Sequence, residues 1–243
     1  MYLRANLTHA MKNIKHYSFD LWSTLIRSNP NFKKERCLFF HKHFNTLGKS
    51  AEETKTIFRT VDLMANYTNE KTGKNIDAEE MYLMVIYLLN NSHVPFRDID
   101  LRRLYQEMED LILQYIPVVY DSHTKETLEA IKAMPDTTLN LLSNTGFIKG
   151  VTLRKILDRL KLSKYFDFQL FSDELGISKP NPTIYQTLLE NIHNLRNDNI
   201  SLKEIVHIGD NVVSDIEGAE SFGINAFQVN SNDNTIKNLI ISP

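Results

Sequence analysis

From about residue 123 onward, segments with the apolar spacing of a helix alternate with short apolar runs typical of buried strands. The expected helices cover 123–134, 148–160, 182–195, 213–222 and 234–240, and the expected strands cover 137–142, 166–171, 204–208 and 225–229. Such alternation implies right-handed crossovers between parallel strands and a sheet covered by helices on both faces. The sequence therefore predicts an α/β fold with a doubly wound parallel sheet.

A further strand is expected much earlier, over residues 13–19, and it belongs with the same sheet. Its apolar run ends at Asp20, which is followed by Leu21, Trp22 and the hydroxyl residues Ser23 and Thr24. In an open parallel sheet, ligands bind beyond the carboxyl ends of the strands. A carboxylate there acts as a nucleophile or holds a hard cation, and the alternative is an Asp that caps the next turn.

The segment between this strand and residue 123 has a helical pattern and shows no strand. Apolar residues mark four helices: Cys37, Phe40, Phe44 and Leu47 before Gly48; Ile57, Val61 and Met64 before a turn at 71–74; 77–90; and 101–115. Four such helices are expected to pack as a small bundle. Linkers are predicted at 28–30 and 117–120. The predicted organisation is an extension over 1–10, a Rossmann-like core over 11–28 and 119–243, and an inserted all-α four-helix domain over 29–118.

Composition excludes several classes of protein. The 28 Lys and Arg nearly balance 30 Asp and Glu, and no basic stripe favours nucleic acid. No apolar run approaches a membrane-spanning length, and residues 1–12 lack the apolar stretch of a secretion signal. The single cysteine, Cys37, excludes an internal disulfide and is expected to be a buried apolar side chain. A cytoplasmic protein is expected, and the oligomeric state is left open.

Two further strand ends carry residues suited to binding an anion. The strand that ends at Leu142 is followed by Ser143 and Asn144, which offer a hydroxyl, an amide and exposed backbone N–H groups, although the same residues are common in plain turns. Beyond the 166–171 strand, Lys179 stands immediately before a proline-flanked helix start. Its ammonium group would neutralise neighbouring anions there, and the alternative is a solvated surface lysine.

The last strand end carries two carboxylates five residues apart. Asp210 follows the 204–208 strand, and Asp215 stands at the start of the next helix. Both can face one point and supply oxygen ligands to Mg²⁺, with Gly209 permitting a close approach. The alternative for Asp215 is helix capping. His207 lies within the strand and is expected to be a core residue whose side chain points away from the loop.

Taken together, these strand ends resemble the signature of the haloacid dehalogenase-like hydrolase superfamily. The resemblance is carried by Phe19-Asp20 with Thr24-Leu25, Ser143-Asn144, Lys179-Pro180-Asn181-Pro182 with Ile184-Tyr185, and Gly209-Asp210 with Asp215 and Gly218-Ala219. Order and spacing agree, and the resemblance covers nearly the whole chain from residue 13. It implies that the helical insertion is a cap domain.

The resemblance also implies roles for these residues. Asp20 would attack phosphorus and form an aspartyl-phosphate that water hydrolyses, while Lys179 would offset charge. Ser143 and Asn144 would hydrogen-bond the transferring group. Mg²⁺ would be held by Asp20, Asp210, the backbone carbonyl of Trp22 and waters, with Asp215 as a ligand or as a partner of the ligands. The implied partner is a small phosphorylated molecule, with no nucleic acid and no membrane.

Trp22 departs from the pattern of the family's phosphatases, which place a second aspartate there as a general acid and base. Indole has no proton to exchange near neutral pH, so good leaving groups are the expected substrates. An aromatic residue at this position is shared with family dehalogenases, which makes halide displacement an alternative. A non-catalytic ligand-binding module is a third. The retained Asp210 and Asp215 favour a magnesium-dependent phosphatase, because halide displacement needs no cation.

Overall fold

The computed structural model describes residues 13–93, 98–196 and 198–240, so the predicted extension over 1–10 lies outside the described residues. Its centre is a five-stranded parallel sheet with the strand order β5-β4-β1-β6-β7. The strands are β1 (His16–Phe19), β4 (Thr138–Ser143), β5 (Phe168–Phe171), β6 (Ile205–Gly209) and β7 (Asn225–Gln228). The predicted first strand thus lies at the middle of the sheet, between β4 and β6.

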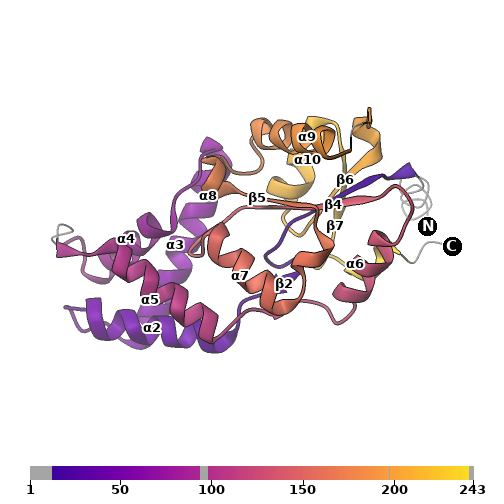
Figure 1. Ribbon diagram of the computed structural model, residues 1–243. Helices are drawn as coiled ribbons and strands as arrows, with labels where there is room; N and C mark the ends of the chain where they lie inside the picture. The colour runs from indigo at the N-terminus through magenta and orange to yellow at the C-terminus, as the bar shows by residue number, and fades with distance from the viewer. Residues whose placement is uncertain (1–12, 94–97, 197, 241–243) are drawn as a thin grey trace.

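Helices cover both faces of this sheet (Figure 1). One face packs on α6 (Thr124–Lys132) and α7 (Gly150–Leu160), and the other packs on α9 (Pro182–Arg196) and α10 (Gly218–Phe222). Successive side chains of a strand point to opposite faces, and β1 follows this rule. Its Tyr17 and Phe19 join the apolar cluster of α6 and α7. This confirms the predicted doubly wound α/β core.

The insertion after β1 is a bundle of four helices with its own apolar cluster (Figure 1). These helices are α2 (Pro30–Phe44), α3 (Ala51–Thr72), α4 (Ala78–Leu89) and α5 (Leu101–Gln114). Local sequence sets the ends of α3: Ser50 and Glu53 form a capping box, and Gly73 ends the helix at a left-handed φ of 67°. Cys37 is buried in the cluster, as expected.

Both predicted linkers contain or adjoin short strands. Ile26–Arg27 (β2) pairs antiparallel with Val118–Val119 (β3), so the chain enters and leaves the bundle as two paired strands. A two-residue strand is too short to show the alternation on which a prediction from sequence depends. The predicted linker over 117–120 therefore contains a short strand that the sequence did not predict.

Other differences lie at helix ends. α2 stops at Phe44, so Leu47 is outside it and exposed. The predicted helix over 213–222 begins as a π-helix, Val212–Glu217, before α10. A short helix, α8 (Ser172–Leu175), was not predicted. The remaining helical turns are of 3-10 type: Ser163–Tyr165, Leu202–Glu204 and Ile236–Leu239.

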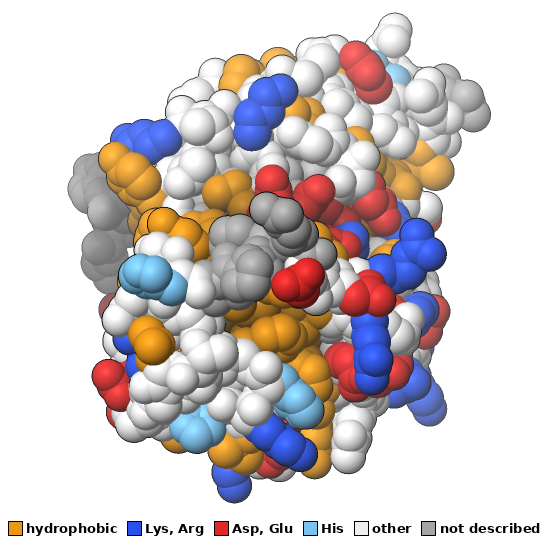
Figure 2. Space-filling model, turned by 90° about the vertical axis from the view of Figure 1, so that its left-hand side faces the viewer, with side chains coloured by type: hydrophobic (Ala, Val, Ile, Leu, Met, Phe, Trp, Pro, Cys, Tyr) orange, Lys and Arg blue, Asp and Glu red, His pale blue; other side chains and the backbone are white. Residues whose placement is uncertain are grey.

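The end of the molecule formed by the bundle carries apolar side chains on its surface (Figure 2). Large exposed apolar residues of the bundle are Leu38, Leu63, Met64, Tyr67 and Tyr87. They lie outside the apolar cluster that joins the four helices. Within the described part of the chain, none of the helices combines the length and apolar character needed to cross a bilayer.

Candidate active site

The predicted site residues gather where β1, β4 and β6 end. Asp20 follows β1, Ser143 ends β4, and Asp210 follows β6. Asp20 is 7% exposed, and its backbone N–H donates to the carbonyl of Ile208 on the neighbouring strand at 2.8 Å. The sheet therefore fixes the backbone on which this carboxylate stands.

Lys179 is a buried cation at the centre of this group, with 1% of its surface exposed. Its Nζ lies 3.0 Å from Asp20 Oδ1, 2.7 Å from Asp215 Oδ1 and 2.7 Å from the carbonyl oxygen of Leu142. Burial disfavours the charged ammonium, but Asp20 and Asp215 outweigh it and raise the pKa of Lys179 above its ordinary value. The lysine is thus a charged partner of two carboxylates and not a surface residue.

Asn144 locks the backbone that carries Lys179. The Asn144 side chain accepts from the Lys179 backbone N–H at 2.8 Å and donates to the Lys179 carbonyl at 2.9 Å. Ser143 is buried, and its hydroxyl donates to the Asn144 carbonyl at 3.2 Å. In this structure both side chains bind protein groups, and Asn144 also has a structural function that the sequence did not reveal.

Three carboxylates converge at one point: oxygens of Asp20, Asp210 and Asp215 lie within 4.8 Å of one another. Burial raises the pKa of Asp20 to about 6, although Lys179 opposes this. Burial and the neighbouring acids Asp20 and Asp215 raise the pKa of half-buried Asp210 to about 7. Burial acts on Asp215 too, but Lys179 and His207 overcome it and keep its pKa below the ordinary value. Three acids facing one ammonium group make a donor set that fits a hard divalent cation such as Mg²⁺.

Gly209 gives Asp215 its space. A Cβ on this glycine would lie 2.2 Å from Asp215 Cγ, far closer than any van der Waals contact. The Asp215 carboxylate therefore sits against the end of β6, where its Oδ2 accepts from the Asn211 backbone N–H at 3.0 Å. The group that approaches Gly209 closely is the side chain of Asp215, which belongs to the following helix.

Several contacts that hold the site were not found from the sequence. The Thr24 hydroxyl donates to Asp20 Oδ2 at 3.0 Å. Gln228 and Ser231 donate to the Asp210 carbonyl at 3.2 and 2.5 Å. Thr24 stands four residues after Asp20 and was a readable signal, whereas Gln228 at the end of β7 and Ser231 just after it are brought near only by the fold.

Trp22 lies beside the nucleophile candidate in the turn that follows β1. It is half-buried and packs against the apolar cluster of the core. The next residue, Ser23, adopts a left-handed φ of 60°, a conformation that favours glycine. The turn closes with a bond from the Ser23 N–H to the Ile26 carbonyl at 2.8 Å.

His207 was expected to point away from the loop, and this was wrong. It is fully buried, but its Nε2 lies 3.2 Å from Asp215 Oδ1 and 3.3 Å from Lys179 Nζ. The reason is that the helix after β6 folds back over Gly209, which brings Asp215 down to the face where His207 points. Side chains two residues apart share a face, so the His207 and Gly209 spacing was the available signal.

The cap meets the core beside these residues. From the end of α3, Glu70 Oε1 accepts from Asn211 Nδ2 at 3.2 Å and from the Ser214 hydroxyl at 3.3 Å. The Gly73 carbonyl accepts from the Ser178 N–H at 3.1 Å, immediately before Lys179. One end of the cap is therefore attached to the two loops that carry the metal and lysine candidates.

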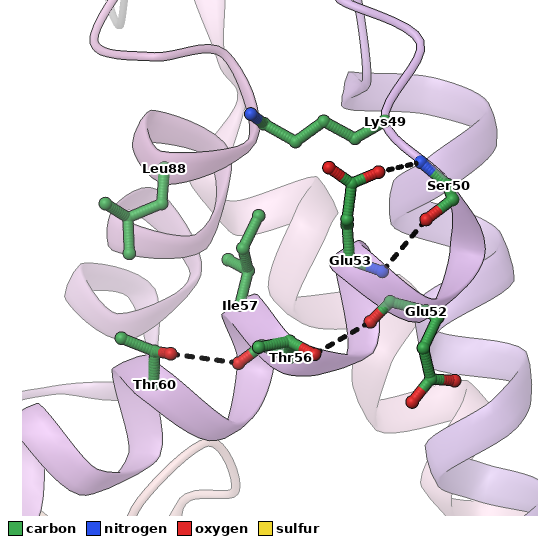
Figure 3. A pocket seen from close by; sticks show the side chains of 8 residues that line it. All are labelled: Lys49, Ser50, Glu52, Glu53, Thr56, Ile57, Thr60 and Leu88. Atoms are coloured by element: carbon green, nitrogen blue, oxygen red, sulfur yellow. Dashed lines mark hydrogen bonds between the residues drawn. The ribbon is translucent and has the colours of Figure 1, made fainter.

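A separate hollow of about 440 Å³ lies on the cap, between the start of α3 and the end of α4 (Figure 3). Its lining residues are Lys49, Ser50, Glu52, Glu53, Thr56, Ile57, Thr60 and Leu88. Ser50 and Glu53 bond each other in the capping box, and Lys49 binds Asn91. None of the predicted site residues lines this hollow.

Comparison with protein families agrees with this geometry. A model described as haloacid dehalogenase-like hydrolase matches residues 14–223. The chain belongs to this family. The family assignment, the α/β fold and the class of hydrolase are thereby established.

Individual relatives divide between two chemistries. The chain is 26% identical to (S)-2-haloacid dehalogenase 1 of Pseudomonas sp. (strain CBS-3) over 90% of this chain and 86% of that enzyme. It is 27% identical to glyceraldehyde 3-phosphate phosphatase of Pyrococcus furiosus over 63% of this chain and 65% of that enzyme. The match thus spans just under two thirds of the phosphatase.

Solved structures share the fold at low sequence identity. The magnesium-bound HAD-hydrolase YfnB from Bacillus subtilis superposes with a TM-score of 0.68 at 16% identity, covering 92% of each chain. A HAD phosphatase from Thermococcus onnurineus gives a TM-score of 0.62 at 21% identity, covering 91% of this chain and 88% of that chain. At these identities the likeness supports the fold alone.

Proposed function

We propose that this hydrolase is a Mg²⁺-dependent phosphatase that acts on a small phosphorylated metabolite through an aspartyl-phosphate at Asp20. The observation that carries the proposal is the convergence of Asp20, Asp210 and Asp215 around one lysine. Displacing a halide from carbon needs no cation, so the retained Asp210 and Asp215 favour a metal-assisted reaction. A phosphoryl group with its negative oxygens does need a cation there.

The proposed reaction begins with attack of a carboxylate oxygen of Asp20 on phosphorus. The new O–P bond forms while the bond from phosphorus to the leaving oxygen breaks, and water then hydrolyses the aspartyl-phosphate to release phosphate and restore the carboxylate. Thr24 and Lys179 hold the two Asp20 oxygens in place. Lys179 also offsets negative charge on the phosphoryl oxygens, and donors at Ser143 and Asn144 bind them.

Mg²⁺ would be held by Asp20, Asp210, the Trp22 backbone carbonyl and waters. Asp215 is the remaining candidate, and both of its oxygens already accept protein hydrogen bonds. When bound, the cation supplies positive charge that neutralises the phosphoryl oxygens. The residue sites, the domain limits at 29–118 and the phosphorylated partner are all part of this proposal.

Phosphate release from p-nitrophenyl phosphate tests the proposal, measured with and without Mg²⁺. We expect activity that needs Mg²⁺ and disappears in Asp20→Asn, because an amide is not a nucleophile. Asp110→Asn, an exposed carboxylate on α5, is the matched control and keeps full activity. Metal-independent release, or release that survives Asp20→Asn, contradicts the proposal.

Trp22 sets the expected substrate range. Without an acid at this position the enzyme favours substrates whose leaving group needs no proton, such as aryl esters, acyl phosphates or anhydrides. Trp22→Asp supplies the missing acid and should raise turnover of simple alkyl phosphates, by up to about 10²-fold given the usual contribution of general acid catalysis. Unchanged alkyl phosphate turnover means that another group already donates the proton.

Dehalogenation is the second candidate, and two observations favour it. The dehalogenase relative matches along most of its length, and Trp22 is an aromatic residue at the position that dehalogenases share. Halide release from a 2-haloacid in the presence of a chelator, lost in Asp20→Asn, supports this reaction. Binding of a phosphorylated ligand with neither activity supports a non-catalytic member of the fold.

A further inference from the structure

His207 and Lys179 form a buried pair whose hydrogen bonds can be counted. An ammonium group has three N–H donors. Those of Lys179 have three oxygen acceptors in reach: Asp20 Oδ1, Asp215 Oδ1 and the Leu142 carbonyl. No lysine proton remains for the His207 ring, although its Nε2 is 3.3 Å away.

This count of the Lys179 hydrogen bonds indicates which ring nitrogen of His207 carries the proton. If the Nε2 of His207 carries the proton, it donates to Asp215 Oδ1 at 3.2 Å. Its Nδ1 then accepts from the Ser18 hydroxyl at 3.0 Å. With this tautomer, the side-chain polar atoms of Ser18, His207 and Asp215 all form hydrogen bonds. With the opposite tautomer, the Nε2 lone pair would face the Lys179 ammonium, whose three protons already bind other acceptors.

The imidazole is neutral in this arrangement. A second cation 3.3 Å from Lys179 Nζ would be repelled, because both groups are buried and the repulsion is poorly screened. A neutral ring with one N–H is a fixed donor toward Asp215.

Strand register builds this contact. Ser18 on β1 and His207 on β6 are direct partners across the parallel pair, so both side chains point to the same face. Tyr185 packs edge-on against the His207 ring from α9, with ring centroids 5.9 Å apart. The imidazole is thus held by Ser18 and Tyr185, and Gly209 leaves space for Asp215 to reach it.

We propose that His207 is a positioning residue: through its Nε2–H it fixes the Asp215 carboxylate, which in turn holds Lys179 against Asp20. Ser18 selects the tautomer by donating to Nδ1. The consequence for catalysis rests on the proposed function, but the hydrogen-bond arrangement does not. His207 touches no reacting atom in this scheme, so its loss lowers the rate without removing the reaction.

Three variants test the proposal in the full-length protein. His207→Leu keeps the volume of the side chain and removes the donor, so kcat should fall about 10- to 100-fold, the usual effect of losing a group that orients a metal or catalytic residue. The KM for p-nitrophenyl phosphate should stay within about twofold. His207→Gln, which retains an N–H donor, should recover much of kcat, and Ser18→Ala should give a smaller loss.

His16 provides the matched control, because it is an equally buried histidine on the same sheet. It bonds Thr138 and Asn140 instead of the site, at 2.8 and 2.9 Å. His16→Leu should lose stability and keep kcat. Equal kcat losses in His16→Leu and His207→Leu would mean that burial alone explains both, and this overturns the proposal.

Two further measurements test the role of His207 without an activity assay. Calorimetric titration with Mg²⁺ should give weaker binding in His207→Leu than in the wild type, and unchanged binding overturns the positioning role. Long-range ¹H–¹⁵N NMR spectra of the histidine rings should show a neutral Nε2–H ring whose signals vanish in His207→Gln. An Nδ1–H ring or an imidazolium overturns the assignment even if the variants fail to fold.

These experiments distinguish a failure of the proposed function from a failure of the positioning role of His207. If the wild type releases no phosphate, the proposed function fails, while the NMR tautomer and the Mg²⁺ titration still decide the role of His207. If phosphate release depends on Asp20 and Mg²⁺ but His207→Leu matches the wild type in kcat, only the positioning role fails.

Discussion

The strand-end site and the junction between cap and core are built from the same residue types but in different surroundings. At the site, Lys179 and Asp215 are each 1% exposed, so their charges are shielded from water and bound to each other. At the junction, Lys149 of the core pairs with Glu79 of the cap while both side chains keep about a quarter of their surface exposed. At the site, each buried charge depends on its protein partner. At the junction, water also reaches both charged groups.

The difference separates two tasks. Removing one member of a buried ion pair leaves an uncompensated charge, which costs about 3–5 kcal/mol. A fully exposed pair contributes only about 0–1 kcal/mol, so the partly exposed Lys149–Glu79 pair is expected to contribute less than the buried one. We infer that the core holds the reacting groups in place. The contacts of the four-helix bundle at Glu70, Gly73 and Glu79 would then determine how easily the bundle covers the site.

The largest expected effect comes from removing the buried cation. Lys179→Met leaves Asp20 and Asp215 facing each other without the ammonium, so kcat should fall at least about 10³-fold. The free energy of unfolding should drop by about 3–5 kcal/mol, measured by urea denaturation. Lys125→Met, on the exposed side of α6, should change neither quantity. A Lys179→Met protein with wild-type stability would show that the buried charges are not coupled as described.

Gly209→Ala tests the space reserved for Asp215. The added methyl overlaps Asp215 Cγ, so the carboxylate must move, with a loss of about 1–3 kcal/mol in unfolding free energy and a large loss of kcat. Gly48→Ala is the control, because it strains a left-handed φ of 67° but meets no atom within 4 Å. It should cost about 1 kcal/mol and leave kcat intact. Normal kcat in Gly209→Ala contradicts the placement of Asp215.

Stability should depend on pH and Mg²⁺ together. The folded-state pKa values of Asp20 and Asp210 are raised to about 6 and about 7 from 3.8, so between these values the folded state binds more protons than the unfolded state. These two carboxylates therefore contribute stability to the metal-free protein that is lost as pH rises from about 4 to about 7, while buried His16 and His207, whose pKa values are lowered to about 4, contribute in the opposite direction. Because Mg²⁺ binds the ionised carboxylates, it should raise Tm more at pH 8 than at pH 5. Equal increases at both pH values contradict this, and Asp210→Asn should reduce the difference.

The smallest effect is expected at the junction. Glu70→Ala removes the acceptor for Asn211 and Ser214, contacts worth about 0.5–1.5 kcal/mol, so KM should rise about two- to tenfold with kcat unchanged. Glu70→Gln keeps an acceptor and should lie nearer the wild type, and Glu126→Ala on α6 is the neutral control. If kcat falls as far as in Lys179→Met, the separation of tasks between cap and core is wrong.

Much of the fold was predictable because helix and strand periods are local. The alternation after residue 123 and the apolar run before Asp20 predicted the five core strands within one to three residues at each end. β2, β3 and α8 were missed, since two-residue strands and a single helical turn are too short to show the period of their own class. The π-helical start of the segment after Asn211 has no sequence signature of its own.

By itself the sequence determined which residue types follow four strand ends, and hence a family and a class of chemistry. Only the tertiary structure decided that Asn144 locks the Lys179 backbone, that His207 faces Asp215 and that Glu70 reaches Asn211. Each of these contacts joins a side chain to an atom placed by another loop or helix. Their geometry depends on how segments fold back on the sheet, which no local pattern encodes.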